Sequence, residues 1–391
     1  MQIWKFLLDG ITGDLSKKKI LPALAQFAEI NHEKVQIQLI GYSRSEANYS
    51  EILSILNQNS STGTNFLNQI SFLTGQYDDG GVFFDLIAGL KEDERLINYL
   101  AIPPQTFVKI LQNSCPFSNR EIDIIIEKPF GRDLKEAQQM LGVIQACDLK
   151  GKVHFSDHYL FKTASHVSKA ELLNFKNLKN KKLQKITINA LESVDLKERK
   201  GYYEGIGALR DMFVHLFSLL NLGLEFYSQD EIDYSTFSVK NLSLGQYQSY
   251  LEDTQLDNSE TDTYFQINSQ IELGGDKIEL KLESGKKLGQ KDTSILLEFT
   301  DGSSFIWNVN PEKYLELISQ EENLKLGLDK NNYLDHTNLF QDLLDRDHSR
   351  FVDPKYISIT WEMLDKILEF KKAKEISLKI YKDSIYPAEL V

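Results

Sequence analysis

The stretch Phe6-Leu-Leu-Asp-Gly10-Ile-Thr-Gly13-Asp-Leu15 decides the fold class, because two glycines separate an apolar run from a helix-like segment. Residues 4–8 are predicted to form a strand, and residues 15–30, with apolar side chains at helical spacing, a helix. Dinucleotide-binding folds place a tight glycine-rich turn here, where the helix N-terminus offers N–H donors to a pyrophosphate. The turn lacks the third glycine of GxGxxG and is not a P-loop, so an ordinary strand-to-helix turn is the alternative.

A second strand, expected over residues 35–40, supports a nucleotide site because of the residues at its end. It runs into Gly41-Tyr-Ser43-Arg44. NAD enzymes carry Asp or Glu at the end of this strand to bind a ribose hydroxyl, whereas an arginine suits the 2′-phosphate of NADP. This position favours NADP, with a solvated surface arginine as the alternative.

The order of strand-like and helix-like segments predicts two domains. They alternate over residues 1–165, with further strands at 97–102, 122–126 and 153–155, which predicts an α/β Rossmann domain with a parallel sheet covered on both faces. Residues 166–391 are predicted to form an α+β domain with a large, mainly antiparallel sheet, because strands follow one another with few helices between. Its strands are expected at 185–190, 263–267, 277–282, 294–299 and 305–309, and its main helices at 207–222 and 357–374.

The composition is that of a soluble globular protein, with 41% hydrophobic and 26% charged residues. No run of about 18 apolar residues is present, and the apolar start at residues 1–8 is too short for a signal peptide. Only Cys115 and Cys147 occur, and we interpret them as incidental packing residues, not as a disulfide framework or a metal site. We therefore expect a cytoplasmic protein with no membrane segment and no metal centre.

The formal net charge of −13 bears on the class of partner. It argues against nucleic acid, because binding a phosphate backbone relies on surplus Lys and Arg. It does not argue against a small phosphorylated ligand, which a local cluster of a few cations can bind on an acidic protein.

Four separated segments resemble the glucose-6-phosphate dehydrogenase family, in the family's order and across nearly the whole chain. The first is similar to the family's opening fingerprint, the second to its hinge, the third to its substrate motif and the fourth to its late phosphate-binding loop. They read Gly10-Ile-Thr-Gly-Asp-Leu-Ser-Lys-Lys-Lys19, Ile126-Glu-Lys-Pro-Phe-Gly-Arg-Asp133, Asp157-His-Tyr-Leu160 with Lys162, and Ser284-Gly-Lys-Lys-Leu288 with Lys291.

The resemblance implies the residues of a cofactor site and a substrate site. The cofactor site comprises Gly10, Thr12, Gly13, Asp14, Leu15, Ser43, Arg44 and Lys128, and the bond from Lys128 to Pro129 is expected to be cis. The substrate site comprises Lys19, Lys128, His158, Tyr159, Lys162, Glu192, Asp211, Lys286 and Lys291.

Each group of substrate residues has a chemical role and an alternative. His158, Tyr159, Lys162 and Lys291 would donate to a phosphate dianion, and Glu192 and Asp211 would accept hydrogen bonds from sugar hydroxyls. His158 and Tyr159 could otherwise be core residues, and the lysines of the late loop a solvated charged run. Phe161-Lys162-Thr163 stands where the family has Gly-Lys-Glu, a departure that bears on the sugar bound.

Oxidising a sugar hemiacetal needs a general base for the O1 proton, usually a histidine oriented by a carboxylate. By resemblance these are His215 and Asp157. The family places its histidine five residues after the aspartate that corresponds to Asp211, whereas His215 follows Asp211 by four. We favour a one-residue gap, with Leu216 in the catalytic position and His215 outside the mechanism as the alternative.

These observations predict NADP-dependent oxidation of glucose 6-phosphate at C1 to the 6-phosphoglucono-lactone, with NAD as a further cofactor to test. The alternatives are a dehydrogenase of the same fold for another hexose 6-phosphate, such as an amino sugar phosphate, and a catalytically silent paralogue that binds cofactor. By resemblance the protein is expected to be a homodimer or homotetramer.

Overall fold

The computed structural model describes residues 1–60, 70–77, 79–167, 169–228, 232–328 and 332–390. The chain divides into two compact units, Met1–Lys162 with Asn332–Ser358, and Thr163–Asn331 with Ile359–Val391. The first break lies three residues before the predicted boundary at 165. The structure departs from the predicted division in assigning Asn332–Ser358 to the first unit, where Leu339, Phe340 and Leu343 are buried in its hydrophobic core.

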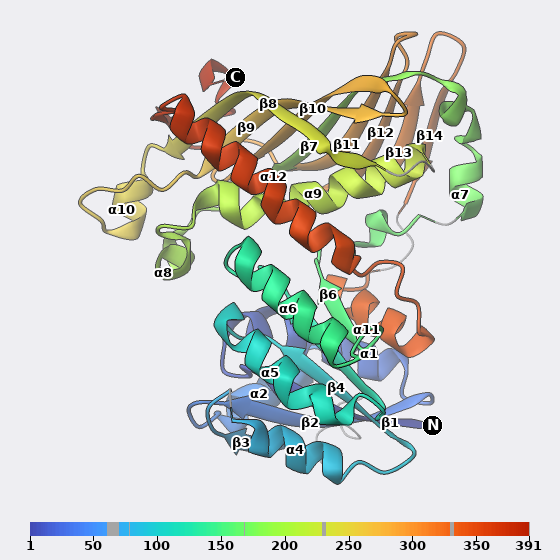
Figure 1. The fold of residues 1–391 in the computed structure, drawn as a ribbon, viewed down its shortest axis with the longest axis vertical. Helices are drawn as coiled ribbons and strands as arrows, with labels where there is room; N and C mark the ends of the chain where they lie inside the picture. Colours follow the sequence, from blue (N-terminus) through green and yellow to red (C-terminus); the bar gives the residue numbers. More distant parts are fainter. Residues whose placement is uncertain (61–69, 78, 168, 229–231, 329–331, 391) are drawn as a thin grey trace. The chain divides into compact units, whose positions relative to one another are not determined.

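The first unit is built on a six-stranded sheet in the order β3-β2-β1-β4-β5-β6, with every neighbouring pair parallel (Figure 1). This order reverses between β1 and β4, as in doubly wound dinucleotide-binding sheets. The predicted Rossmann architecture is therefore confirmed. The strands are β1 Gln2–Asp9, β2 Val35–Ser43, β3 Ile70–Thr74, β4 Glu94–Leu100, β5 Ile122–Glu127 and β6 Val153–Ser156.

Helices cover both faces of this sheet, as the alternation of side chains along β1 shows. Trp4, Phe6 and Leu8 pack in the core that contains α1 and α11, whereas Leu7 and Asp9 face side chains of α4 and α5. The helices of this unit are α1 Leu21–Ile30, α2 Tyr49–Gln58, α4 Gly80–Ala88, α5 Phe107–Ser114, α6 Leu134–Ala146 and α11 Asp335–Asp345, and its short helical turns are η1 Ser16–Ile20, η2 Pro104–Thr106 and η3 Cys115–Phe117.

The helix predicted over residues 15–30 begins with a wider turn than the sequence suggested. Residues Ser16–Ile20 form a π-helical turn, η1, before α1 begins. Pro22 is the second residue of α1, and a proline neither donates to the carbonyl four residues earlier nor leaves room for it. A π turn in front of the proline accommodates this misfit.

The second unit is built on a nine-stranded sheet in the order β14-β13-β12-β11-β7-β10-β9-β8-β15. The pairs β7–β10 and β8–β15 are parallel and the other neighbours antiparallel, which confirms the large, mainly antiparallel sheet. The strands are β7 Leu183–Leu191, β8 Asp233–Tyr247, β9 Tyr264–Leu273, β10 Asp276–Gly285, β11 Asp292–Phe299, β12 Ser304–Asn310, β13 Tyr314–Ile318, β14 Asn323–Gly327 and β15 Leu378–Tyr381.

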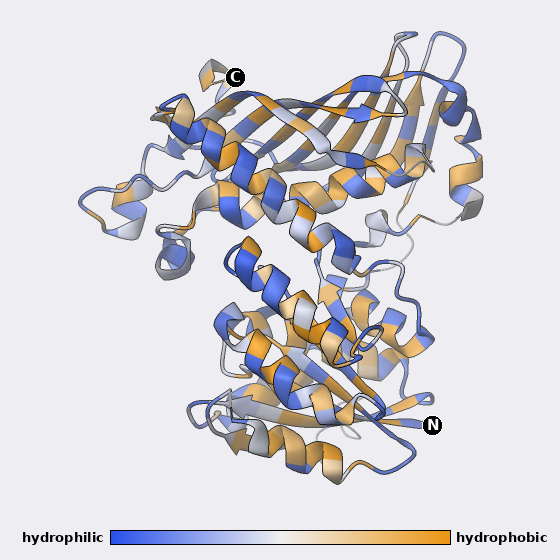
Figure 2. Ribbon diagram, in the orientation of Figure 1, coloured by the Kyte–Doolittle hydropathy of each residue, from blue (hydrophilic) through white to orange (hydrophobic). Residues whose placement is uncertain are grey.

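Two long helices accompany this sheet, α9 Gly207–Tyr227 and α12 Pro354–Ala373 (Figure 1). Helix α9 contacts β7, β9, β10 and β11 and is mostly apolar, whereas α12 alternates apolar and polar bands (Figure 2). Across the residues that the structure describes, no helix has both the length and the apolar character to cross a bilayer. The shorter helices are α7 Lys169–Leu173, α8 Lys200–Tyr203, α10 Tyr250–Thr254, η4 Thr163–Ser165, η5 Lys176–Asn180, η6 Lys197–Arg199 and η7 Ala388–Leu390.

The expectation that the cysteines are separate packing residues is wrong, because Cys115 and Cys147 form a disulfide. Each cysteine directly follows a helix of the first unit, Cys115 after α5 and Cys147 after α6. The two helices are neighbouring crossovers of a parallel sheet, so they run in the same direction and their ends meet. The Cα atoms are 4.8 Å apart. Sequence spacing alone carries no sign of this pairing.

Candidate active site

The turn after β1 has the tight geometry that a dinucleotide loop requires. Gly10 adopts a φ of +82°, and a Cβ at this position would lie 2.3 Å from the carbonyl oxygen of Ala101. The N–H of Gly13 donates to the carbonyl of Gly10 at 2.9 Å, and the Ser16 hydroxyl donates to the same oxygen at 2.8 Å. Only glycine fits this left-handed, closely packed position.

The residues at the end of β2, Ser43 and Arg44, lie at the same edge, since the carboxyl ends of parallel strands share one edge of a sheet. The Ser43 hydroxyl donates to the carbonyl of Ser45 at 2.6 Å. The exposed Arg44 places its guanidinium 5.7 Å from the centre of the Tyr77 ring. Such stacking limits the directions in which an arginine can point. Tyr77 was not predicted as part of this site.

A buried carboxyl, Asp9, directly precedes the glycine turn and was also missed from the sequence. It is 3% exposed at the end of β1 and lines a small cavity with Tyr42, Tyr77, Asn98 and Asn113. Burial raises the pKa of Asp9 to about 8, and the Asn98 side chain offsets part of this rise. Asp9 therefore carries a proton at neutral pH.

The hinge between β5 and α6 adopts the predicted geometry, with a cis bond from Lys128 to Pro129. The preceding residue, Glu127, is buried and accepts hydrogen bonds from the Tyr99 hydroxyl and, at 3.3 Å, from the Ser156 hydroxyl. A ring nitrogen of His336 lies 3.2 Å from the same carboxylate oxygen. These contacts fix the backbone from which Lys128 projects.

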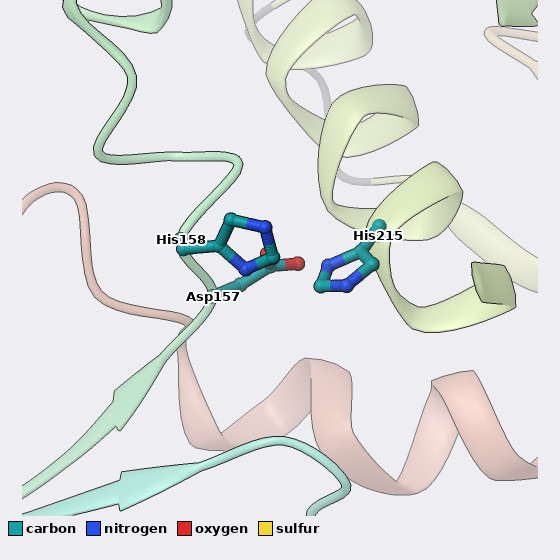
Figure 3. Close-up of side chains that lie close together, drawn as sticks. All are labelled: Asp157, His158 and His215. Atoms are coloured by element: carbon teal, nitrogen blue, oxygen red, sulfur yellow. The ribbon is translucent and has the colours of Figure 1, made fainter. Parts of the chain in front are cut away.

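The segment after β6 carries Asp157 and His158, and α9 carries His215 (Figure 3). Asp157 is fully buried, and one of its oxygens accepts the backbone N–H of Tyr159 at 3.0 Å. The ring of His158 meets the ring of Tyr159 edge-on at 4.8 Å between centres. Lys162 follows, with its ammonium 5.1 Å from the Tyr159 ring centre.

The second unit brings Glu192 and Lys286 together, because each follows one of two neighbouring parallel strands, β7 and β10. The Lys286 ammonium, almost fully buried, pairs with the Glu192 carboxylate and lies 3.6 Å from the sulfur of Met212 on α9. Burial raises the pKa of Glu192, but the Lys286 ammonium outweighs it and the net shift is downward. Glu192 is therefore held as a carboxylate.

Helix α9 places Asp211 and His215 on one face, one turn apart, because it is continuous from Gly207. Both are buried, and Asp211 accepts a hydrogen bond from the Tyr202 hydroxyl at 3.2 Å. Asp211 raises and His215 lowers the pKa of Glu192, so both lie on the side of the helix near that carboxylate. Leu216 is equally buried, so burial alone does not distinguish the two alternatives.

The remaining predicted residues are more exposed. Thr12 and Gly13 are half-buried in the turn, and Asp14 and Leu15 are exposed beside it, with Asp14 paired to Lys18 at 3.3 Å. Lys19 is exposed on η1, and Lys291 is exposed between β10 and β11. Each unit thus gathers part of the candidate site: the first its glycine turn, Arg44, Lys128 and the Asp157–Lys162 segment, the second Glu192, Asp211, His215 and Lys286.

Comparison with known proteins covers both units. The family model described as glucose-6-phosphate dehydrogenase, NAD binding domain, matches residues 7–166, and that described as glucose-6-phosphate dehydrogenase, C-terminal domain, matches residues 171–224. The glucose-6-phosphate 1-dehydrogenase of Emericella nidulans is 25% identical over 92% of this chain and 84% of its own length. That of Helicobacter pylori is 24% identical over 93% of this chain and 92% of its own.

Solved structures agree in fold. A glucose-6-phosphate dehydrogenase in complex with its substrate glucose-6-phosphate superposes with a TM-score of 0.81 at 21% identity, covering 100% of this chain and 96% of that one. The glucose-6-phosphate 1-dehydrogenase from Mycobacterium avium gives 0.80 at 19% identity, covering 98% and 94%. The two family models follow each other along the chain in the order of the two architectures found here, and on this evidence the chain belongs to the glucose-6-phosphate dehydrogenase family.

Proposed function

We propose that the protein oxidises glucose 6-phosphate at C1 to 6-phosphoglucono-1,5-lactone with NADP⁺. The observation that carries the proposal is the family membership across both units, together with the two groups of polar side chains that the units gather. Oxidation of the hemiacetal of a sugar phosphate needs a cofactor site, a phosphate site and a general base. The chain has residues suited to each.

The residues at the glycine turn and at the end of β2 fit a nicotinamide dinucleotide with a 2′-phosphate. The left-handed Gly10 lets the backbone approach a pyrophosphate. Arg44 is exposed, with its guanidinium 5.7 Å from the centre of the Tyr77 ring, and the fork of donors on an arginine suits a phosphate monoester. A bound NADP⁺ supplies the hydride acceptor, and we assign its binding to Gly10, Thr12, Gly13, Ser43, Arg44 and Lys128, with Asp14 and Leu15 beside the turn.

His215 takes the O1 proton of the sugar in this proposal, while the hydride leaves C1. A histidine titrates near neutrality and so suits this task. We propose Asp157 as the carboxylate that orients the ring and stabilises the imidazolium. The location of His215 on the face of α9 that also carries Asp211 supports its role over that of Leu216.

We assign the remaining polar side chains to the sugar phosphate. His158, Tyr159, Lys162 and Lys291 supply donors for the phosphate. Glu192 and Asp211, both carboxylates within the second unit, are suited to accept hydrogen bonds from sugar hydroxyls. Lys286, Lys128 and Lys19 complete the set of cations.

One observation favours a second candidate, oxidation of a different hexose 6-phosphate such as an amino sugar phosphate. Phe161 and Thr163 flank Lys162 where the family has glycine and glutamate. A panel of glucose 6-phosphate, glucosamine 6-phosphate, mannose 6-phosphate, galactose 6-phosphate and glucose, each with NADP⁺ and NAD⁺, separates the candidates by following reduced nicotinamide at 340 nm. We expect the highest kcat/KM for glucose 6-phosphate with NADP⁺. If no sugar in the panel reduces either nicotinamide cofactor, both candidates are contradicted.

The base is tested by substitution. His215→Asn should preserve folding and binding of both ligands but lower kcat by about 100-fold or more. Asp157→Asn should also lower kcat, and the double variant should lose far less than the product of the two effects. An unchanged kcat in His215→Asn removes His215 from the mechanism.

Light scattering with the same samples tests the predicted homodimer or homotetramer.

A further inference from the structure

The first turn of α11 contacts the loops that carry the candidate site, although it lies more than 170 residues away from Lys162 along the chain. Asp335, the first residue of α11, places a carboxylate oxygen 3.3 Å from the Lys162 ammonium. Asn338, one turn later, donates to the carbonyl of Phe161 at 2.9 Å. The Thr337 hydroxyl donates to the carbonyl of Ala23 at 3.1 Å, which holds the turn against α1. Asp335 is therefore fixed in place next to Lys162.

Lys162 has two neighbours that favour its charge. The centre of the Tyr159 ring lies 5.1 Å from the ammonium, and a carboxylate oxygen of Asp335 lies 3.3 Å from the same ammonium. The side chains of Lys162 and Asp335 are 21% and 30% exposed, so a small anion in solution can reach the ammonium. The N-terminus of α11 also stabilises a carboxylate at residue 335.

We propose that Asp335 is the resident counter-ion of Lys162 and limits the affinity of the candidate site for phosphate. The inference rests on the proposed function only in taking Lys162 as a phosphate ligand. A carboxylate and a phosphate cannot both approach one ammonium without repelling each other. Substrate phosphate must therefore share Lys162 with Asp335, and the acid sets how tightly the phosphate is held.

The direction of the effect follows from comparing the two roles of Asp335. As a partner that orients a partly exposed lysine, Asp335 contributes little to phosphate binding, because such ion pairs have small net free energies. As an anion next to a phosphate dianion on the same ammonium, it weakens phosphate binding by about three- to tenfold at low ionic strength. Repulsion is the larger effect, so removal of the charge should strengthen binding.

The experiment compares Asp335→Asn with the wild type by calorimetric titration with inorganic phosphate at low salt. Asparagine keeps an oxygen that can accept a hydrogen bond from Lys162 but has no charge. Asp335→Glu retains the charge, and Asp345→Asn removes one charge from the far end of the same helix, about 15 Å away. Lys162→Ala shows whether the phosphate binds at this site.

We expect the dissociation constant of phosphate to fall about three- to tenfold in Asp335→Asn, and this gain to shrink in 0.5 M NaCl. It should change less than twofold in Asp335→Glu and Asp345→Asn. Lys162→Ala should weaken binding. In turnover assays, Asp335→Asn should lower the KM for the sugar phosphate and leave the KM for the nicotinamide cofactor unchanged. Damage to the fold would not tighten phosphate binding, so a purely structural role predicts the opposite sign.

Three results overturn the inference: unchanged or weaker phosphate binding in Asp335→Asn, an equal gain in Asp345→Asn, or phosphate binding that survives Lys162→Ala. The titration does not depend on turnover. A protein that oxidises none of the sugars tested but shows the Asp335→Asn gain loses the proposed function and keeps this inference. A protein that oxidises glucose 6-phosphate but shows no gain keeps the function and loses the inference.

Discussion

Replacing Asp9 by asparagine should make the first unit more stable at neutral and alkaline pH. Asp9 is 3% exposed, and burial raises its pKa from 3.8 to about 8. The folded protein therefore keeps a proton on Asp9 that the unfolded chain releases between these two values. Asparagine is nearly the same size, can still face the Asn98 side chain, and never ionises.

The magnitude follows from proton linkage. Between pH 3.8 and about 8 the unfolded state binds fewer protons than the folded state, so the free energy of unfolding falls as pH rises. The slope is about 1.4 kcal/mol per pH unit for one group. The stabilisation from neutral Asp9 is complete below pH 3.8, is lost through this window and is gone above pH 8. At pH 7 the variant should exceed the wild type by on the order of 4 kcal/mol.

The assay needs a signal from the first unit alone. The chain has three tryptophans, of which Trp4 is buried in the first unit and Trp307 and Trp361 lie in the second. In a Trp307→Phe, Trp361→Phe background, Trp4 fluorescence in urea reports on the first unit. Unfolding curves at pH 4, 5, 6, 7 and 8 give the free energy of unfolding for this background with Asp9 intact and with the added Asp9→Asn substitution.

The difference between the two proteins isolates residue 9, because every other titrating group is shared. It should be near zero at pH 4 and increase steadily to pH 8. A difference that does not change with pH would refute the reasoning, since it would mean that Asp9 titrates equally in both states. If the protein with Asp9 intact becomes more stable than the Asp9→Asn variant above pH 6, the folded protein stabilises Asp9 as a carboxylate.

Three further results are expected. Arg44→Ala should raise the KM for NADP⁺ by about 10- to 100-fold and leave that for NAD⁺ nearly unchanged; equal effects on both cofactors contradict the 2′-phosphate assignment. Gly10→Ala should cost about 2 kcal/mol or more in thermal denaturation, because φ is positive and the added Cβ meets a backbone oxygen, whereas Gly142→Ala in open space on α6 should be neutral or stabilising. Replacing both Cys115 and Cys147 by serine removes a crosslink between residues 32 apart in sequence. It should lower the free energy of unfolding of the first unit by about 2–4 kcal/mol in the Trp4 assay. The wild-type protein in reducing agent should have the same free energy of unfolding as this variant.

Local sequence patterns predicted the elements that carry most of the first unit. The apolar runs that became β4, β5 and β6 are buried throughout, and those that became β1 and β2 are buried over most of their length. Strands of a covered parallel sheet are recognisable from such apolar stretches. Strands β3, β8 and β13 to β15 were not predicted. They lie at or near the edges of their sheets, where partly exposed strands carry polar residues and lose that signal.

The sequence by itself determined those features in which a residue acts through its immediate neighbours: the glycine turn at Gly10 and the helix that carries Asp211 and His215. The cis bond from Lys128 to Pro129 was expected only from the resemblance to the family. Tertiary structure alone decided which distant side chains meet. Asp335 reaches Lys162, Tyr77 lies beside Arg44, and Cys115 bonds to Cys147 because the folded chain brings segments that are far apart in sequence to one place. The titration of Asp9 is likewise a tertiary property, since its pKa depends on how completely surrounding strands and helices exclude water.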